Sequence, residues 1–592
     1  MEVYDQRDIK SPSDSNGEIE RSEWHRQIQF TLSLIGYAVG LSSVFRFPYL
    51  ALNYGGGAFL IAYLIFVIFC GIPLYWMEFT LGQFTGLSPV EAFGFAPLFR
   101  GIGWSMMVVS GKISIYYNIL MTWTLYYFFQ SFQWNLPWNS CNNTWNTPAC
   151  FCHSKKCVAF TPSPNGTSST AEFWLLRVLE LSADIDELGG INWPLCGCML
   201  ASWILTYLCL FKGIKSSGRA VYLISFLPYL FFLILVIRGA TLPGADIGLK
   251  YYLYPELEKL KSTRVWTQAA IQLFYSLGPA WGGLITLSSY NHYESKYSRD
   301  AVLLPLVCGV TGILGGLAVF SVVGHLAHSM GKLDISDFMN SGPGLVFIAY
   351  PAALAHIPGA SIIAVCFFAL LFTLGLGSQF ATMGTIISGF NDRFPRTFGR
   401  HKTLFILSIC IAQFFLGLVL VTRAGEYYFQ LFDRYATTNS IVVIATTEVF
   451  SLSFVYGATR LFSNAETMLG QQCKMSRIFW LSAWYFIMPC FMIYLFITVI
   501  MDYIPPIFSN GQPFPQWTVA LGWCIALLSI IPIPLFAFAE IWKHRKNPRN
   551  LFKPRTEWLN TCTNRGLRAE LKKLPVEPLT LDFDDYDIDI NH

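Results

Sequence analysis

Two stretches of this chain decide its fold. They are Gly36-Tyr-Ala-Val-Gly40-Leu-Ser-Ser43, followed at once by Arg46-Phe-Pro48, and Ser276-Leu-Gly-Pro-Ala-Trp-Gly-Gly283. Each stretch lies inside an apolar run that is long enough to cross a membrane. Glycine and proline weaken or interrupt the hydrogen-bond ladder of a helix, so neither run is expected to form one continuous helix. We therefore predict two membrane helices that each break near the middle of the span.

The composition is that of a membrane protein. Of the 592 residues, 54% are hydrophobic and 13% are charged, which is about half of the roughly 25% charge of ordinary soluble proteins. The mean hydropathy is +0.45. The net charge of +4 is small and its basic residues lie in short clusters between apolar runs, so no nucleic-acid partner is expected. No nucleophile and base pair and no histidine spacing typical of a metal site stands out, so we expect neither an enzyme nor a cofactor.

Apolar runs of about 20 residues predict twelve membrane-spanning helices. They are expected near residues 29–50, 57–79, 104–132, 194–211, 219–238, 266–290, 301–328, 360–389, 403–421, 432–455, 477–500 and 517–541. The chain is thus predicted to be an all-α polytopic membrane protein. Its domains are a tail over 1–27, a twelve-helix domain over 28–542 with a large loop over 133–193, and a tail over 543–592.

The two interrupted spans are the first and the sixth, so they open two successive blocks, spans 1–5 and spans 6–10. Interrupted helices at matching positions indicate a transporter built from two inverted five-helix repeats, with its substrate site at the midplane of the membrane. The alternative is a pair of ordinary kinked helices.

The topology follows from the charges in the loops. An even number of spans places both termini on one side, and the loops of that side carry the clustered Lys and Arg residues: Arg21, Arg26, Lys212, Lys215, Arg219, Lys296, Arg299, Arg393, Arg396, Arg400, Lys402, Lys474, Arg477, Lys543, Arg545, Lys546 and Arg549. That side is expected to be cytoplasmic, in the plasma membrane.

The loop over 133–193 falls on the opposite side. It carries glycosylation sequons at Asn142 and Asn165 and four cysteines, at positions 141, 150, 152 and 157, so it is expected to face an oxidising, glycosylating compartment. Three disulfide connectivities are possible for these four residues, Cys141, Cys150, Cys152 and Cys157.

Short motifs spread over most of the chain resemble the neurotransmitter:sodium symporter family, the sodium- and chloride-dependent transporters. The matching stretches are Gly36-Tyr-Ala-Val-Gly40, Arg46-Phe-Pro-Tyr-Leu50, Gly55-Gly-Gly-Ala-Phe59, Pro73-Leu-Tyr-Trp-Met-Glu78, Tyr116-Tyr-Asn118, Leu136-Pro-Trp138, Lys212-Gly-Ile-Lys-Ser-Ser-Gly218 and Ser288-Ser-Tyr-Asn291. Within the family, the chain is most similar to the glycine transporters. That similarity lies in Ala280-Trp-Gly-Gly-Leu-Ile-Thr-Leu-Ser-Ser-Tyr290, Met106-Met-Val-Val-Ser110 and Leu574-Pro-Val576.

The resemblance implies a substrate site at the two breaks. Its residues would be Ala38, Gly40, Ile113, Tyr117, Tyr275, Ser276, Gly278 and Trp281. Gly40 stands where the monoamine transporters of the family have an aspartate, so the substrate should bring its own carboxylate. The Tyr117 hydroxyl would hold that carboxylate and Tyr275 would close over it. Trp281 and Ile113 would leave room only for a small amino acid such as glycine. Without the resemblance, Tyr117 is better read as a core or interfacial tyrosine, and a Trp281 that faced lipid would leave the size undetermined.

The resemblance also implies two gates. Arg46 would pair with Asp433 as the outer gate, and Arg21, beside Trp24, would pair with Asp392 as the inner gate. Pairs that break in each cycle should be accessible to water, because opening a desolvated pair is costly. Permanent structural bridges are the alternative. In the loop over 133–193, the resemblance implies a disulfide between Cys141 and Cys150.

Ion coupling is where the chain departs from the family. The first sodium site would use Ala38, Ser276 and two asparagines, which here are Ser43 and Cys308. A neutral thiol is a poor ligand for a hard cation. The second sodium site would use Gly36, Val39, Leu374 and Ser378, but position 377 is Gly and offers no side-chain oxygen. The three main-chain carbonyls and the one hydroxyl could still hold sodium, with water completing the shell. The chloride site would keep Tyr63, Gln272 and Ser276 but lose two donors, at Cys308 and Gly312.

We therefore expect a sodium-coupled carrier of a small amino acid with altered dependence on sodium and chloride. The alternative is a non-transporting or uncoupled membrane protein that keeps the fold and acts through binding or trafficking. Lipid is the expected environment, and the acidic tails allow either a docking partner or plain solvated ends. Lys112, a cation within the third span, suggests a replacement for missing cation charge. Snorkelling, or pairing with Glu78, is the alternative.

Overall fold

The computed structural model describes residues 23–24, 26–151, 166–211, 214–329, 344–354, 359–399, 401–503, 505 and 513–571. These residues are almost entirely helical. In the part of the chain that the structure describes, the named strands are β1 (Cys150–Phe151) and β2 (Thr167–Ser168), two residues each, which pair in parallel. The predicted all-α architecture is confirmed.

Helices lie on each of the twelve predicted spans. In the first block they are α1 (Gln27–Ala38) with α2 (Ser42–Asn53), α3 (Gly57–Phe66) with α4 (Ile72–Thr85), α6 (Gly101–Gln130), α8 (Trp193–Leu210) and α9 (Ile214–Ala240). In the second block they are α11 (Thr263–Leu277) with α12 (Gly283–Ser288), α13 (Ser298–Ser329), α15 (Ala360–Arg393), α16 (Lys402–Gly417) and α17 (Gly425–Phe432) with α18 (Ser440–Phe450). The last two are α20 (Lys474–Ser482) with α21 (Met488–Met501), and α22 (Gln516–Ile530) with α23 (Pro532–Lys543).

Shorter helices join the spans or follow them. They are α5 (Pro89–Ala92), α7 (Ser169–Glu172), α10 (Ala245–Leu253), α14 (Gly344–Leu354), α19 (Ala458–Leu469) and α24 (Thr556–Leu571).

Length and apolar composition single out seven membrane-crossing helices among the described residues, or up to ten if each sharply bent pair counts as one span. The two predicted spans that this test leaves out are α6, a continuous helix of 30 residues, and the broken pair α11 and α12. The polytopic character of the chain is therefore established. The number twelve and the inverted symmetry stay predictions.

Burial separates inner helices from outer ones. The most apolar part of 57–85 is 72% buried within the protein, whereas the corresponding parts of α8 and of 402–421 are 33% buried. Helices α1 to α4, α6, α11 and α15 thus form the centre of the bundle, and α8, α16, α20 and α21 present apolar side chains outward, as lipid-facing helices do.

Both predicted breaks are present. Helices α1 and α2 meet at an angle of 43°, and α11 and α12 are separated by residues 278–282. Within that segment Gly278, Ala280 and Gly282 have positive φ angles of 64°, 62° and 82°. The freed peptide groups find side-chain partners: the Tyr37 hydroxyl donates to Gly278 O at 2.6 Å, and Ala280 N–H donates to Glu78 Oε1 at 2.7 Å. A buried break is tolerated because its polar groups are satisfied in this way.

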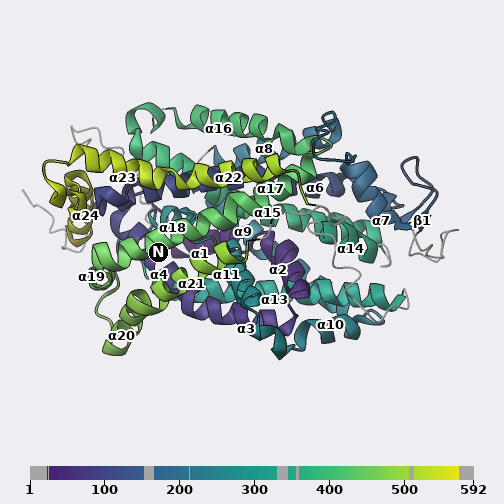
Figure 1. Cartoon of the computed structure of the whole chain (residues 1–592), viewed down its shortest axis with the longest axis horizontal. Coiled ribbons are helices and arrows are strands. Elements are labelled where there is room, and N and C mark those ends of the chain that lie inside the picture. The colour runs from purple at the N-terminus through teal and green to yellow at the C-terminus, as the bar shows by residue number, and fades with distance from the viewer. Residues whose placement is uncertain are drawn as a thin grey trace, which may run out of the picture.

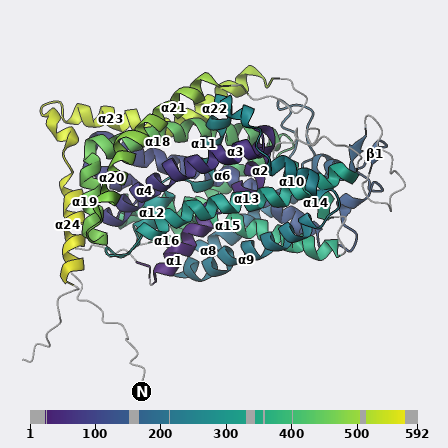
Figure 2. The same cartoon turned by 90° about the horizontal axis from the view of Figure 1, so that it is seen from below.

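The described segments nearest to the two termini lie at the same end of the bundle. Figures 1 and 2 show α24 and α19 at one end and β1 at the other. The N–H of Trp24, near the first described residue, donates to Tyr290 O, and Arg565 of α24 donates to the carbonyls of Ser289 and Asn291. The described parts nearest to the two termini therefore meet the same segment, as same-side termini require. The assignment of this end of the bundle to the cytoplasm rests on the loop charges and stays a prediction.

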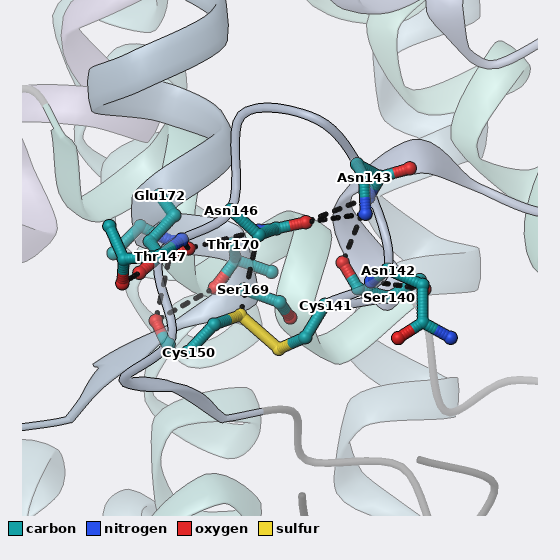
Figure 3. The surroundings of a disulfide bond; sticks show 12 residues. Ser140, Cys141, Asn142, Asn143, Asn146, Thr147, Cys150, Ser169, Thr170 and Glu172 are labelled. Atoms are coloured by element: carbon teal, nitrogen blue, oxygen red, sulfur yellow. Dashed lines mark hydrogen bonds between the residues drawn. A yellow bond between two sulfur atoms is a disulfide. The ribbon is translucent and has the colours of Figure 1, made fainter. Parts of the chain in front are cut away.

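The loop at the opposite end contains the predicted disulfide. Cys141 and Cys150 are bonded to each other, which confirms this pairing, and the surroundings are drawn in Figure 3. Asn146 Nδ2 and Thr147 N–H both donate to the buried carboxylate of Glu172 at 3.0 Å, which ties the loop to α7. Asn142 is exposed on this loop, as a glycosylation acceptor must be. Asn165, Cys152 and Cys157 lie outside the described residues.

Candidate functional site

A cavity of about 920 Å³ lies between the two breaks and extends to the end of the bundle that carries Arg46 and Asp433. It brings together all eight residues predicted for the substrate site: Ala38, Gly40, Ile113, Tyr117, Tyr275, Ser276, Gly278 and Trp281. Residues more than 200 positions apart thus share one wall because the breaks of α1 and α11 face each other.

Tyr117 is bound to the break of the first span. Its hydroxyl, carried by α6, accepts the N–H of Leu41 at 2.9 Å. A Cβ added to Gly40 would lie 3.0 Å from the Tyr117 hydroxyl and less than 3.0 Å from Ser378 Oγ. A side chain at position 40 would have to displace the Ser378 hydroxyl, so packing as well as the sequence disfavours an acidic residue there. The reading of Tyr117 as a plain core tyrosine does not explain a hydroxyl directed at an unwound peptide.

Bulky side chains limit the cavity beside this point. Ile113 and Trp281 are buried and line it. The rings of Trp281 and Tyr275 meet edge to face at 6.3 Å, and Ser110 fixes the break by donating to Trp281 O at 2.6 Å. The alternative in which Trp281 faces lipid is wrong, because the indole lines the cavity and is buried. Among the described residues its buried Nε1–H has no hydrogen-bond partner.

The predicted outer pair is formed. Arg46 Nη1 lies 2.9 Å from Asp433 Oδ2, and the two side chains are 19% and 36% exposed. The guanidinium also lies over the Tyr275 ring, 3.7 Å from its centre, and the Tyr275 hydroxyl donates to the main-chain carbonyl of Asp433. One ion pair and one aromatic ring cover this side of the cavity. Because both charged side chains are partly exposed, water can solvate the two charges when the pair opens, which lowers the cost of separating them.

The inner side is covered by the N-terminal segment. Trp24 is buried, its indole N–H donates to Leu287 O at 3.1 Å, and its ring meets Tyr290 edge-on. Asp392 Oδ2 accepts the N–H of Ser88 at 2.6 Å. Arg21 lies outside the described residues, so its predicted pairing with Asp392 stays a prediction.

The first predicted sodium position holds a thiol. Cys308, on α13, is fully buried and directs Sγ at Ala38 O, 3.2 Å away, and at Ser276 O, 3.5 Å away. The buried Ser43 hydroxyl lies beside the sulfur. Sodium requires oxygen ligands, and here the carbonyls that would supply them are directed at sulfur. The residues present do not fit a sodium ion at this position.

The second predicted position is closed by packing. Ser378 Oγ donates to Tyr37 O at 3.1 Å. A Cβ on Gly377 would lie less than 3.0 Å from Gly36 O, so the backbones of α15 and α1 touch here and no further side-chain ligand can be accommodated. The carbonyls of Val39 and Leu374 remain at this junction, but the hydroxyl that should join them is already bonded to Tyr37.

The predicted chloride position keeps unsatisfied donors. The hydroxyls of Tyr63 and Ser276 lie 2.8 Å apart, and Ser276 Oγ donates to Gln272 O at 2.9 Å. The Gln272 side chain is fully buried, and neither of its amide atoms has a partner in the structure. With Ser276 donating to Gln272 O and Tyr63 bonded to Ser276, the Gln272 amide is the group here without a partner among the described residues. A buried N–H without an acceptor is unfavourable, so this amide could donate to an anion. At Gly312, the Phe47 ring lies 3.2 Å from where a Cβ would be.

Lys112 does not approach either cation position. Its ammonium donates to Ile525 O of α22 at 2.6 Å and is buried. Pairing with Glu78 is wrong, because Glu78 accepts the N–H of Ala280 instead. Snorkelling is also wrong, since the charge ends between two helices. The hypothesis that Lys112 replaces missing cation charge is therefore not supported by its position.

Other polar residues line the cavity that the sequence did not single out: Thr382, Glu426, Gln430 and Asp502. Thr382 lies one helical turn after Ser378 on α15, so the spacing of the helix could have indicated it. Glu426, Gln430 and Asp502 lie near the ends of spans, where charge is common and carries no positional signal.

A membrane-embedded cavity between two mid-span helix breaks, with an ion pair over one entrance, is the arrangement of a secondary transporter. The comparisons with known proteins agree. The model of the sodium:neurotransmitter symporter family matches residues 21–544, and the chain therefore belongs to that family.

Several curated relatives align over nearly the whole chain. It is 39% identical to "Sodium- and chloride-dependent glycine transporter 1" of Xenopus laevis, over 91% of this chain and 88% of that protein. It is 37% identical to "Sodium- and chloride-dependent GABA transporter 2" of Mus musculus, over 96% and 94%. It is 38% identical to the human "Sodium- and chloride-dependent neutral and basic amino acid transporter B(0+)", over 89% and 87%. Relatives named for different substrates are thus about equally similar.

Proposed function

We propose that this protein carries a small amino acid, with glycine as the first candidate, across the plasma membrane by alternating access. The observation that carries the proposal is the contact of the Tyr117 hydroxyl with the Leu41 N–H beside a glycine where a side chain would have to displace the Ser378 hydroxyl. The Leu41 N–H is donated to the tyrosine oxygen, so the Tyr117 O–H is left to donate to a carboxylate, and position 40 itself carries no acid to repel it.

The break of the first span supplies further favourable charge. Helix α2 begins at Ser42, next to Leu41, and the first N–H groups of a helix lack intrahelical partners and carry partial positive charge. A substrate carboxylate at this point needs such partners, because an uncompensated ion at the midplane of a membrane is very costly. Its ammonium group would be met by main-chain carbonyls at the ends of α1 and α11, where both helices stop.

The walls favour a small side chain. Ile113 and Trp281 line the same cavity as Tyr117 and Gly40 and both are buried, so their bulk reduces the room for a longer side chain. This supports glycine over the larger substrates named for some relatives.

Access would alternate between the two covered sides. Outward opening needs Arg46 and Asp433 to part and Tyr275 to turn away. Inward opening needs α12 to leave Trp24. Because the inner half of the broken sixth span is the short helix α12, it can tilt without moving α11.

A second candidate is an uncoupled or non-transporting member of the family. The thiol at the first sodium position and the closed packing at Gly377 favour it, since ion binding is what drives a coupled cycle. The two candidates differ in whether substrate crosses the membrane at all.

The test is uptake of radiolabelled glycine, alanine and GABA, each measured separately, by cells with the protein at their surface. Tyr117→Phe keeps the ring and removes the hydroxyl, and a hydrogen bond to a charged group is worth about 1.5–3 kcal/mol, so glycine uptake should fall roughly 10- to 150-fold. If surface-expressed natural protein moved none of these amino acids, the non-transporting candidate would replace this one.

A further inference from the structure

The junction of the two broken spans is closed by a single side chain. Cys308, on α13, places its sulfur between Ala38 O, at the end of α1, and Ser276 O, near the end of α11. These helices come from different halves of the chain, so one thiol connects three helices at the point where two of them stop.

Both carbonyls belong to unwound or terminal turns. The last carbonyls of a helix have no intrahelical donor, and in a buried break they must be met by something else. An S–H group is a weak donor, but its sulfur is large enough to reach both oxygens from one position. The single S–H can donate to one of these carbonyls at a time, so the thiol compensates one of them and lies against the other.

The space around the sulfur is filled. Cys308 is fully buried, the Ser43 hydroxyl lies beside it, and a Cβ on Gly315 would lie 2.6 Å from Ser43 O. Helix α13 is thus pressed against α2 on this side. An added cation would have to displace the sulfur, and it would then meet a soft, neutral ligand in place of a hard oxygen.

We propose that the Cys308 thiol takes the place of a bound cation as the link between the two broken spans, so that this protein needs no sodium at this position. Cys308 is then a positioning residue that determines ion dependence. The part of the inference that concerns transport rests on the proposed function, and the part that concerns binding does not.

The second position is altered in a different way, by close packing and by a hydroxyl that is already bonded. There a hydroxyl, that of Ser378, bonds to Tyr37 O, and the Gly377 backbone lies against Gly36 O. At this second position the predicted serine ligand is thus bonded elsewhere and Gly36 O is covered, while the carbonyls of Val39 and Leu374 remain.

The first experiment measures the thermal unfolding midpoint of the purified full-length protein in sodium chloride and in choline chloride of equal ionic strength. Cys308→Asn, alone and with Ser43→Asn, supplies amide oxygens in place of the thiol and the hydroxyl. A ligand that binds only the folded state raises the midpoint, so these variants should gain a sodium-specific rise on the order of 2 °C relative to the natural chain. Cys410→Ala, at a buried cysteine of α16 away from the breaks, is the matched control and should gain none.

Two further variants test the link itself. In choline chloride, Cys308→Ala should lower the midpoint, and Cys308→Ser, which keeps a donor, should restore most of it. Equal sodium responses in the natural chain and in both asparagine variants would overturn the proposal. So would a Cys308→Ala protein that is as stable as the natural one.

Uptake separates this inference from the proposed function. Glycine uptake by the natural chain should change less than twofold when choline replaces sodium, whereas the Ser43→Asn and Cys308→Asn double variant should lose most of its uptake. If no variant moved glycine and the midpoints still behaved as expected, transport would fail and the thiol link would stand. If sodium removal reduced uptake equally in both proteins, the thiol link would be refuted and transport would stand.

Discussion

The tight space at Gly40 gives the sharpest test of the substrate site. A Cβ at this position would lie 3.0 Å from the Tyr117 hydroxyl and 3.6 Å from Ser378 Cβ, but less than 3.0 Å from Ser378 Oγ. The serine hydroxyl is thus the atom that a Gly40→Ala side chain would have to displace, and it donates to Tyr37 O at 3.1 Å.

The magnitude follows from packing. Forcing an extra methyl group into a filled site costs about 1–3 kcal/mol. Since about 1.4 kcal/mol corresponds to a tenfold change in rate, uptake of glycine at low concentration should fall roughly 5- to 150-fold. Removing the obstructing hydroxyl should relieve the clash, so adding Ser378→Ala to Gly40→Ala should recover most of the loss. The two changes should therefore be strongly non-additive.

The assay is initial-rate uptake of radiolabelled glycine, normalised to surface protein, for the natural chain, each single variant and the double variant. Gly384→Ala is the matched control, because this glycine lies on α15 as Ser378 does and a Cβ there meets nothing within 4 Å. Its uptake should equal that of the natural chain. A Gly40→Ala variant with normal uptake, or a double variant no better than Gly40→Ala, would refute this account of the site.

Three further predictions concern charge and donors. Arg46→Gln leaves Asp433 without its partner and should reduce glycine uptake about tenfold. Adding Asp433→Asn should recover part of the lost uptake. A double variant with lower uptake than Arg46→Gln alone would contradict the pairing. Lys112→Met should leave sodium and chloride dependence unchanged, because the ammonium contacts only Ile525 O among the described polar groups; any changed ion dependence would refute this. Gln272→Leu removes the unpartnered amide and should make uptake less sensitive to replacement of chloride by gluconate, and an unaltered chloride response would exclude Gln272 from the anion position.

The broken spans could be predicted because their cause is local. Glycine and proline in the two quoted stretches weaken a helix wherever they stand, so sequence alone located the breaks. The pairing of Arg46 with Asp433 came from the resemblance, since 387 positions separate the two residues. Locating an intramembrane arginine requires only the sequence, but locating its partner requires the fold or a relative.

The direction of Lys112 could not be predicted. Helical spacing states which face of α6 carries the lysine, but the neighbour on that face is α22, more than 400 residues further along the chain. The sequence equally showed that position 377 is glycine, and this suggested a missing ligand. That the backbone of α15 then occupies the space against Gly36 O is a packing result, which residue identity does not contain.

The differences from the family pattern are of two physical kinds. Where the first cation was expected, the thiol of Cys308 lies between the carbonyls of both breaks. Where an anion was expected, the buried Gln272 amide is left without a partner among the described residues. If the protein had lost transport without selection, buried polar groups without hydrogen-bond partners would be expected at every altered position, because nothing would select a replacement. A compensating thiol at the first cation position, an open substrate cavity and an unpartnered Gln272 amide together favour a carrier with shifted ion dependence.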